Sequence, residues 1–294
     1  MYTLLILIAI LLYTLQIVAL KKLNAKTLYS TLIVTSSFSA LIAVFLFLVN
    51  LNGGIKVSSQ TILWGIAFGA VSIATLCCEN MALQTGSMSY TVFFTSASMI
   101  IPTLGGIILW KEPLTINIAA GILLFLTSFY LILVAGKKED ERGNLRWMLF
   151  CLITWLLNGC SSLITKAHQT IMDGKESSEL MMIGFAAAAL ISFSATFFIK
   201  RLYSTDNIPT VKPIFSSKFI ALLLLTAIGS GGGNVLTTML ASKVAASILF
   251  PFLLGGMTVA ATLYSVIFEK AKISIWGKVG LLVGIIAITV INIA

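Results

Sequence analysis

The sequence predicts an all-α membrane protein in which ten transmembrane helices form two inverted five-helix repeats. Three observations predict this class: the composition, the length of the apolar segments, and a pattern that occurs once in each half. Hydrophobic residues make up 59% of the 294 residues and charged residues only 10%, whereas soluble domains carry about 25% charged residues. Such a chain cannot cover a surface that faces water, and lipid is its expected solvent.

Ten apolar segments have the roughly 20 residues that a helix needs to cross the hydrocarbon of a bilayer. Lipid cannot pair exposed backbone groups, and the sequence lacks the alternating segments of a barrel, so each segment is expected to be helical. The first is expected to remain in the protein, because no basic region precedes it and no small-residue cleavage site follows it. The ten expected spans are 2–20, 28–50, 61–81, 87–110, 114–134, 145–165, 178–200, 217–240, 244–267 and 273–292.

Most of the 19 Lys and Arg residues lie in the odd-numbered loops between these spans. The positive-inside rule therefore puts the odd loops in the cytoplasm and both termini outside. Topology and anionic lipid headgroups explain the basic loops, so no nucleic-acid partner is expected.

A similar pattern ends two segments of the chain. Segments 85–112 and 242–269 consist mainly of small and apolar residues and end at Glu112 and Glu269. A short polar hinge and another apolar span follow each glutamate. Internal repetition of this kind predicts a duplicated architecture.

A polar run at 137–144 divides the chain into two parts, 1–136 and 145–294, with five expected spans in each. Because five is odd, the second part must enter the membrane from the side opposite to the first. Two similar units are then inverted relative to each other, which is the arrangement that alternating access uses.

The first span of each half carries an aromatic residue followed three positions later by a carboxamide. These pairs are Tyr13 with Gln16, and Trp155 with Asn158. Positions i and i+3 share one face of a helix, so each pair could contact a substrate from pseudo-symmetric positions. The carboxamides could equally hold helices together, and the aromatic rings could form a cation–π surface or simply pack.

These features occur in an order that resembles the drug/metabolite transporter superfamily, in its ten-helix EamA-like branch. The glycine that follows the aromatic residue in that family is missing in both halves. The resemblance implies transport of small metabolites such as amino acids, amphipathic cations or nucleosides, more often by export than by import. It also implies that both termini lie in the cytoplasm, whereas the distribution of Lys and Arg puts them outside. It rests on Tyr13–Gln16 and Trp155–Asn158, on Ala82–Ser87, and on Glu112-Pro113-Leu114-Thr115 with Gly121 and Glu269-Lys270 with Ile273-Ser274 and Gly280.

Glu79 is the strongest candidate for chemistry, because it lies within the third expected span. A carboxylate inside a membrane is costly, and the default interpretation is a functional group that faces a cavity. Glu79 could couple transport to protons or balance the charge of a cationic substrate, and the neighbouring Asn80 is a candidate substrate contact. Alternatively, Glu79 lies near the helix end and faces lipid headgroups.

Three consecutive glycines interrupt the eighth expected span at 231–233. Each weakens a helix by roughly 1 kcal/mol relative to alanine, so we expect a bend, a close helix crossing or a break that lines the cavity; a tight packing seam is the alternative. Asn234 follows the glycines at the level of Glu79 and is a further candidate substrate contact. Pro102 and Pro251 are expected to kink the fourth and ninth spans.

Other polar residues have simpler interpretations. Glu112 and Glu269 stand at helix ends, where each is expected to serve the N-terminus of the following helix. Lys166 and His168 end the sixth span, and His168 is expected to face solvent. The cysteines are expected to pack as small apolar residues, with no disulfide and no metal site. The four are Cys77, Cys78, Cys151 and Cys160.

The sequence therefore predicts a secondary active transporter, proton-coupled through Glu79 and more often an exporter, with a cavity lined by the first, third, fourth, sixth, eighth and ninth spans. A facilitative uniporter or channel-like permease on the same fold is the alternative. An enzyme is not expected, because no Ser-His-Asp, HExxH or Walker pattern is present. The expected partners are a small-molecule substrate and the lipid bilayer, the expected location is the plasma membrane, and the expected state is a monomer or homodimer without cofactors.

Overall fold

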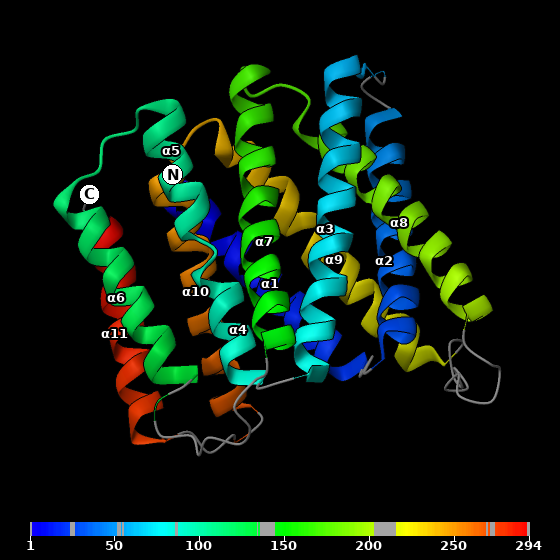
Figure 1. Ribbon diagram of the computed structural model, residues 1–294. Coiled ribbons are helices and arrows are strands. Elements are labelled where there is room, and N and C mark those ends of the chain that lie inside the picture. The colour runs from blue at the N-terminus through cyan, green and yellow to red at the C-terminus, as the bar shows by residue number, and fades with distance from the viewer. Residues whose placement is uncertain are drawn as a thin grey trace.

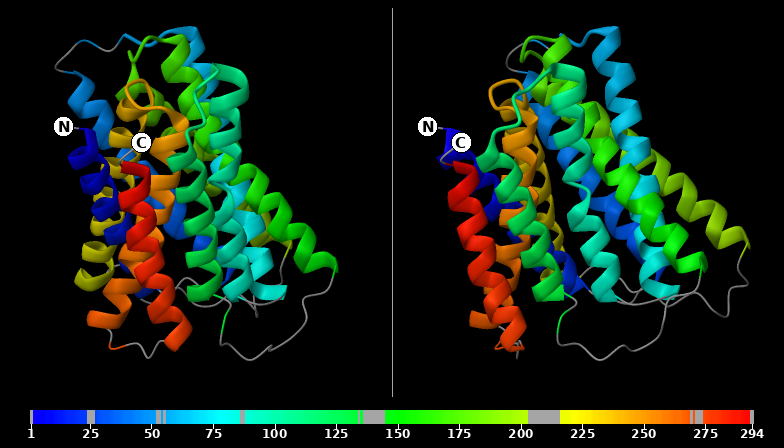
Figure 2. Two further views of the ribbon diagram at one scale, coloured as in Figure 1. Left: turned by 90° about the vertical axis from the view of Figure 1, so that its left-hand side faces the viewer. Right: turned by 60° about the vertical axis from the view of Figure 1, so that its left-hand side comes forward.

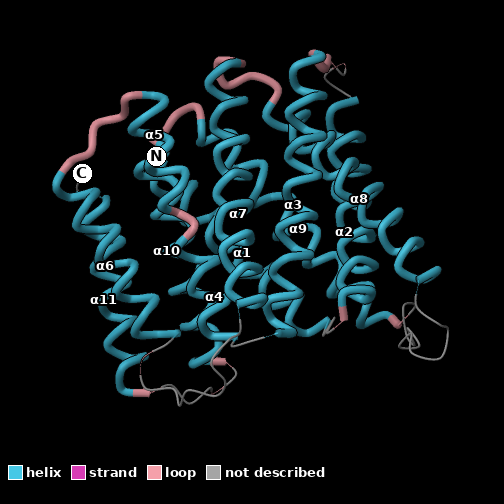
Figure 3. Tube along the Cα trace, viewed as in Figure 1, coloured by secondary structure: helices cyan, strands magenta, loops and turns pink. Residues whose placement is uncertain are grey.

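The protein is a bundle of long helices in this computed structural model (Figures 1 and 3). The structure describes residues 2–23, 27–51, 54, 56–85, 88–133, 135, 145–202, 216–268, 270 and 274–292. These residues form eleven α-helices: α1 Tyr2–Leu23, α2 Leu28–Leu51, α3 Ser59–Thr85, α4 Met88–Ala97, α5 Ile100–Trp110, α6 Ile116–Leu133, α7 Leu145–Ile171, α8 Ser177–Leu202, α9 Ser217–Ala241, α10 Ala246–Ile267 and α11 Ile275–Asn292.

The predicted all-α membrane class is confirmed. Within the described ranges, eight spans are long and apolar enough to cross a bilayer, with α4 and α5 counted together as Thr91–Trp110. Helices α6 and α11 are apolar but shorter. Large apolar side chains such as Leu63, Ile108 and Phe193 are exposed on the outside of the bundle, as a lipid-facing surface requires.

The fourth expected span is two helices instead of one. Helix α4 ends at Ala97 and α5 begins at Ile100, so Ser98 and Met99 form a break. Pro102 explains its position, because proline has no N–H to donate to the carbonyl four residues earlier, which is that of Ser98. Ile101 N donates to that carbonyl instead, at 3.0 Å. Pro251 has no such effect on continuity, since α10 runs through it.

The glycine run forms a packing seam and not a break. Helix α9 is continuous from Ser217 to Ala241. Within the run, an added Cβ on Gly232 would lie 3.0 Å from Leu12 Cδ1, and one on Gly233 would lie 3.0 Å from the Tyr13 ring. Just before the run, a Cβ atom on Gly229 would lie 2.5 Å from the Leu12 carbonyl oxygen and 2.7 Å from the Gln16 nitrogen of α1. Small residues permit such close backbone approach between membrane helices, so the predicted break is wrong and the close crossing is correct.

Neighbouring helices come from both parts of the chain. Helix α1 packs beside α9 and α10, α2 beside α8, α3 beside α7 and α8, and α6 beside α11. Figure 2 shows α6 and α11 running side by side along one edge, and both termini at the same end of the bundle. We call this the terminal end and the other the opposite end.

Two apolar clusters occupy the two sides of the bundle. Phe125 of α6 and Phe250 of α10 belong to a buried cluster that also includes residues of α1 and α11. Phe38 of α2, Phe68 of α3 and Met181 of α8 belong to the second cluster. Helix α9 contributes residues to both clusters.

Candidate functional site

A cavity of about 1020 Å³ lies in the interior of the bundle. All six spans that were expected to line it do so, namely α1, α3, α4, α7, α9 and α10. Helices α2 and α8 also contribute, through residues such as Thr35, Ser39 and Phe185, which sequence reasoning missed. Five of the predicted site residues line it: Tyr13, Gln16, Glu79, Asn158 and Asn234.

Two predicted site residues do not line this cavity. Asn80 turns toward α2, where its amide nitrogen donates to Thr31 Oγ1 at 3.2 Å. Trp155 is partly buried on α7 and is likewise not among the lining residues. In each half, therefore, the carboxamide of the aromatic–carboxamide pair lines the cavity. Of the two aromatic partners, Tyr13 lines it and Trp155 does not.

Glu79 brings a carboxylate to the cavity wall, in the part of α3 that approaches the opposite end. Thr95 Oγ1 of α4 lies 3.3 Å from Glu79 Oε1 and can donate to it. Among the described lining residues Glu79 is the only carboxylate, and none is Lys, Arg or His. The wall otherwise consists of hydroxyl, carboxamide, aromatic and aliphatic side chains.

Asn158 connects this wall to the break between α4 and α5. Its amide nitrogen donates to the Thr95 carbonyl at 3.3 Å and to Ser98 Oγ at 2.6 Å. Ser98 Oγ also donates to the Thr95 carbonyl, at 2.6 Å. The carboxamide thus satisfies polar groups at the break, and Thr95 joins Glu79 and Asn158 into one polar cluster of α3, α4 and α7.

The seam between α1 and α9 forms the facing wall. Tyr13 rests on Gly233, where an added Cβ would lie 3.0 Å from the ring, and its hydroxyl lies 3.4 Å from Thr237 Oγ1. The Asn234 amide nitrogen donates to the Ser230 carbonyl at 2.9 Å. The glycines therefore position Tyr13 against α9 at the level of Asn234.

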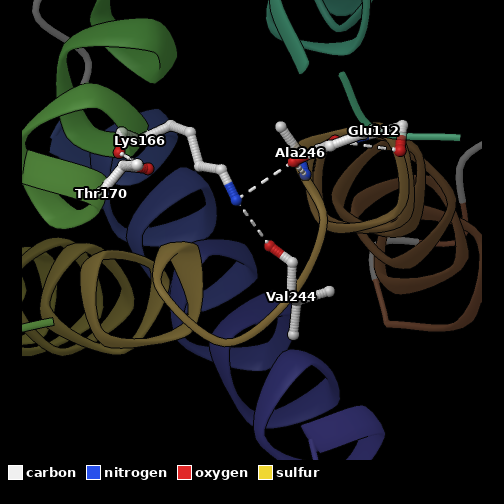
Figure 4. Close-up of polar contacts among 6 residues, drawn as sticks. Glu112, Lys166, Thr170, Val244 and Ala246 are labelled. Carbon is white, nitrogen blue, oxygen red and sulfur yellow. Dashed lines mark hydrogen bonds and ion pairs between the residues drawn. The ribbon is translucent and has the colours of Figure 1, made fainter. Parts of the chain in front are cut away.

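A buried ion pair lies at the terminal end, next to the cavity. Lys166 Nζ of α7 is 3.2 Å from Glu112 Oε1, and the two side chains are 9% and 10% exposed. Lys166 Nζ also donates to the Val244 carbonyl at 3.0 Å. Figure 4 shows the Lys166 side chain reaching from α7 toward Val244 and the first residues of α10.

Glu112 caps the N-terminus of α10 and not that of the following helix, so the prediction for this residue is wrong. Its carboxylate accepts from Ala246 N at 2.9 Å and from Ser247 N and Oγ at 3.0 and 3.1 Å. Helix α6 has its own cap, because Thr115 Oγ1 accepts from Ile118 N at 3.3 Å. Its repeat counterpart, Glu269, lies outside the described residues.

The local sequence explains how Glu112 reaches α10. Lys111 ends α5 with a φ of 54°, a left-handed conformation that turns the chain, and Glu112 N donates to the Gly106 carbonyl at 3.1 Å. A Cβ on Gly106 would collide with the Glu112 carboxylate. Burial raises the pKa of this carboxyl, but the Ser247 and Ala246 N–H groups and Lys166 outweigh burial and hold the pKa below its usual range.

His168 is fully buried, so its predicted exposure to solvent is wrong. Helix α7 continues to Ile171, beyond its expected end at 165, and carries the imidazole to α3. Nε2 lies 2.8 Å from Thr61 Oγ1, and Nδ1 lies 3.0 Å from Gln169 Nε2.

The same hydrogen-bond network ties α3 to the start of α8. Glu176 Oε2 accepts from Ser58 N at 3.0 Å and from Ser58 Oγ at 2.9 Å, and Ser58 Oγ lies 3.0 Å from Thr61 Oγ1. Ser177 Oγ donates to Gln169 Oε1 at 2.7 Å. The C-terminal end of α7 is thus fastened to α5 and α10 through Lys166 and to α3 and α8 through His168 and its neighbours.

Comparison with known proteins supports the fold alone. No protein-family model matches the chain, and no curated protein matches it. A solved structure described only as "Crystal structure of protein" is 16% identical, with a TM-score of 0.77 over 99% of this chain and 98% of its own. At that identity the likeness establishes a shared helical architecture, and the resemblance to drug/metabolite transporters stays a prediction.

Proposed function

We propose that this protein is a secondary active transporter that moves small metabolites across the plasma membrane by alternating access. The cavity of about 1020 Å³, lined by helices from both parts of the chain, carries the proposal. Pockets of roughly 300–1,000 Å³ hold drug-sized molecules. An intramembrane carboxylate on the cavity wall, Glu79, adds the group that proton coupling needs.

Reciprocal contacts support two inverted repeats, 1–136 and 145–294, joined by 137–144. Gly121 and Gly280 occupy matching places after the two repeated glutamates. An added Cβ on Gly121 would meet Ile291, and one on Gly280 would meet Ile132. The same contact is therefore made twice across α6 and α11 with the partners exchanged, as a two-fold axis between inverted units requires. The pairs α1–α9 and α3–α7 correspond in the same way.

The two ends of the cavity support alternating access. Lining residues continue to the opposite end through Ser265 of α10, Ile132 of α6 and Gly277 of α11. At the terminal end the last lining residues include Thr165, beside the buried Lys166–Glu112 pair. We propose that this pair is a gate, closed in this conformation, that opens when substrate leaves or enters at the terminal end.

Glu79 is proposed to exchange protons and substrate in turn, with amino acids or amphipathic cations as cargo and export as the direction. Thr95 ties Glu79 to α4, next to the α4–α5 break, so a change in its protonation acts on a segment with fewer helical hydrogen bonds. The proposed placement in the drug/metabolite transporter superfamily, as a monomer or homodimer, rests on the sequence resemblance.

Proteoliposomes test this function. Purified protein is expected to move a radiolabelled amine or amino acid when a pH gradient is imposed, and Glu79→Gln is expected to abolish the gradient-driven flux while the protein still inserts. Glu179→Gln, at the start of α8 outside the cavity, is the matched control. Flux that ignores the pH gradient in the wild type would favour the uniporter, and gradient-driven flux that survives in Glu79→Gln would remove Glu79 from the mechanism.

A further inference from the structure

We propose that the cavity selects organic cations that carry N–H donors, such as primary ammonium groups, over quaternary ammonium ions and over carboxylates. The inference rests on the proposed transport function and names the substrate class of the same cavity. It follows from where the protein's own hydrogen-bond donors are used.

The threonine hydroxyls on the wall donate to their own helices. A threonine hydroxyl has one proton and two acceptor lone pairs, and inside a helix it commonly donates to the carbonyl four residues earlier. Once that proton is used, only lone pairs remain for a ligand. Five lining threonines are bound in this way: Thr75 to Val71 O at 2.8 Å, Thr165 to Ser161 O at 3.2 Å, Thr237 to Gly233 O at 2.8 Å, Thr258 to Leu254 O at 3.0 Å and Thr262 to Thr258 O at 2.7 Å.

Two neighbouring hydroxyls must then donate as well. The Tyr13 hydroxyl lies 3.4 Å from Thr237 Oγ1, and Ser96 Oγ lies 3.3 Å from Thr258 Oγ1. Because both threonine protons already point to backbone carbonyls, Tyr13 and Ser96 are the donors in these pairs. Thr95 Oγ1 faces only acceptors too, at 3.3 Å from Glu79 Oε1 and 3.1 Å from the Thr91 carbonyl.

The two asparagines on the wall also use amide protons inside the protein, whereas the second N–H of Asn234 and the carboxamide of the lining residue Gln16 stay available to a ligand. Asn234 Nδ2 donates to the Ser230 carbonyl, and Asn158 Nδ2 donates to the Thr95 carbonyl and to Ser98 Oγ. A backbone carbonyl can only accept, so these contacts fix which amide atom is the nitrogen. Each side chain has its Oδ1 acceptor left for a ligand. Serine hydroxyls on the wall can rotate and follow whichever ligand is present.

The charge of the wall favours the same kind of ligand as its hydrogen-bonding groups do. Glu79 is the only carboxylate among the described lining residues, and none of them is Lys, Arg or His. The nearby Lys166 ammonium is bound to Glu112 and to the Val244 carbonyl. The wall therefore presents more acceptors than donors together with one carboxylate, and the aromatic rings of Phe38, Phe68 and Phe250 supply apolar surface beside them.

A primary ammonium group fits this wall because it has three donors and no acceptor. A quaternary ammonium has the same charge but no donor, so its binding would leave buried acceptors unpaired, which weakens binding by roughly tenfold or more. A carboxylate would add a second negative charge beside Glu79 and bring no donor.

Three probes of one shape test the proposal: phenethylammonium, its N,N,N-trimethyl analogue and 3-phenylpropanoate. Each is titrated against purified full-length protein in nanodiscs, and the dissociation constant is taken from the rise in thermal stability. Phenethylammonium is expected to bind roughly tenfold or more tightly than the trimethyl analogue, and 3-phenylpropanoate is expected not to bind. Glu79→Gln should lower the affinity for phenethylammonium, whereas Glu179→Gln should bind as the wild type does.

Equal or tighter binding of the trimethyl analogue overturns the proposal, as does binding of 3-phenylpropanoate or of none of the three. These failures differ from failure of the transporter. A protein that carries the trimethyl analogue in proteoliposomes as fast as phenethylammonium refutes the substrate class and keeps the transport function. A protein that moves no amine or amino acid in either direction refutes the transport function itself.

Discussion

The two ends of the bundle are held by different kinds of contact. At the terminal end, buried charges and a fully buried imidazole link α7 to four other helices. At the opposite end, α1 meets α10 through an exposed contact of 3.4 Å between Lys22 Nζ and the Tyr264 hydroxyl, and the cavity lining continues to Ser265 and Gly277. Polar groups that close one end can be hydrated when that end opens, which an apolar plug cannot.

Removing one partner of the terminal pair is expected to have the largest effect on stability. Lys166→Met leaves the buried Glu112 carboxylate without its countercharge, held only by the donors of Ala246 and Ser247, and breaking a buried ion pair destabilises by about 3–5 kcal/mol. A fall in the midpoint of thermal unfolding in nanodiscs measures it. Lys22→Met at the opposite end is the matched control, because its contact is exposed, and no measurable change is expected there.

A double variant separates the charge from the gate. Lys166→Met with Glu112→Gln removes both charges and should recover much of the lost stability. Thr165→Cys, in a protein without its native cysteines, reports access to the cavity from the terminal side. Its reaction with a membrane-impermeant thiol reagent should be faster in the Lys166→Met and the double-variant backgrounds than in the protein with the intact pair. Unchanged reactivity would show that the pair stabilises the fold without gating the cavity.

The seam between α1 and α9 gives the next largest effect on stability. Gly229→Ala places a Cβ against the backbone of Leu12 and Gln16, which cannot move aside, and overpacking costs about 1–3 kcal/mol. Gly232→Ala meets the end of the Leu12 side chain instead, at 3.0 Å, and should cost less. Equal unfolding midpoints for the two variants would contradict the close backbone seam.

The smallest effect is a dependence of the terminal end on pH. The pKa of Glu112 is lowered in the folded protein, against the effect of burial, by the Ser247 and Ala246 N–H groups and Lys166. Its stabilisation is therefore full above the ordinary glutamate pKa of about 4.3 and is lost as pH falls through the folded-state pKa. The difference in unfolding midpoint between wild type and Glu112→Gln should be constant from about pH 8 to pH 5 and shrink in more acidic buffer. A difference that grows on acidification would refute the assigned cap.

Local features of the sequence predicted the helices and part of the cavity. Apolar length determines the spans, and the cost of a carboxylate in lipid singled out Glu79. Pro102 marked an irregular segment, although the break lies four residues earlier, at the carbonyl to which proline has no N–H to donate. The glycine run could not be resolved from sequence, because glycine permits both a break and a close crossing, and the neighbour Leu12 decides between them.

Contacts between distant residues could not be predicted. Glu112 caps a helix that begins more than a hundred residues later, and its own sequence neighbourhood gives no sign of the partner. His168 was misplaced because α7 extends past the last strongly apolar residues and packs there against α3. Both errors arise from tertiary packing at the terminal end, where polar residues replace the hydrophobic signal that marks a span.

The exchanged glycine contacts between α6 and α11 describe an isologous interface within one chain. In such an interface residue i of one copy meets residue j of the other, and j meets i. Gly121 with Ile291 and Gly280 with Ile132 satisfy that condition. Under the proposed inverted duplication, a half-length chain would meet an inverted copy of itself through this same surface, so joining two copies would require no new complementarity at this edge of the bundle.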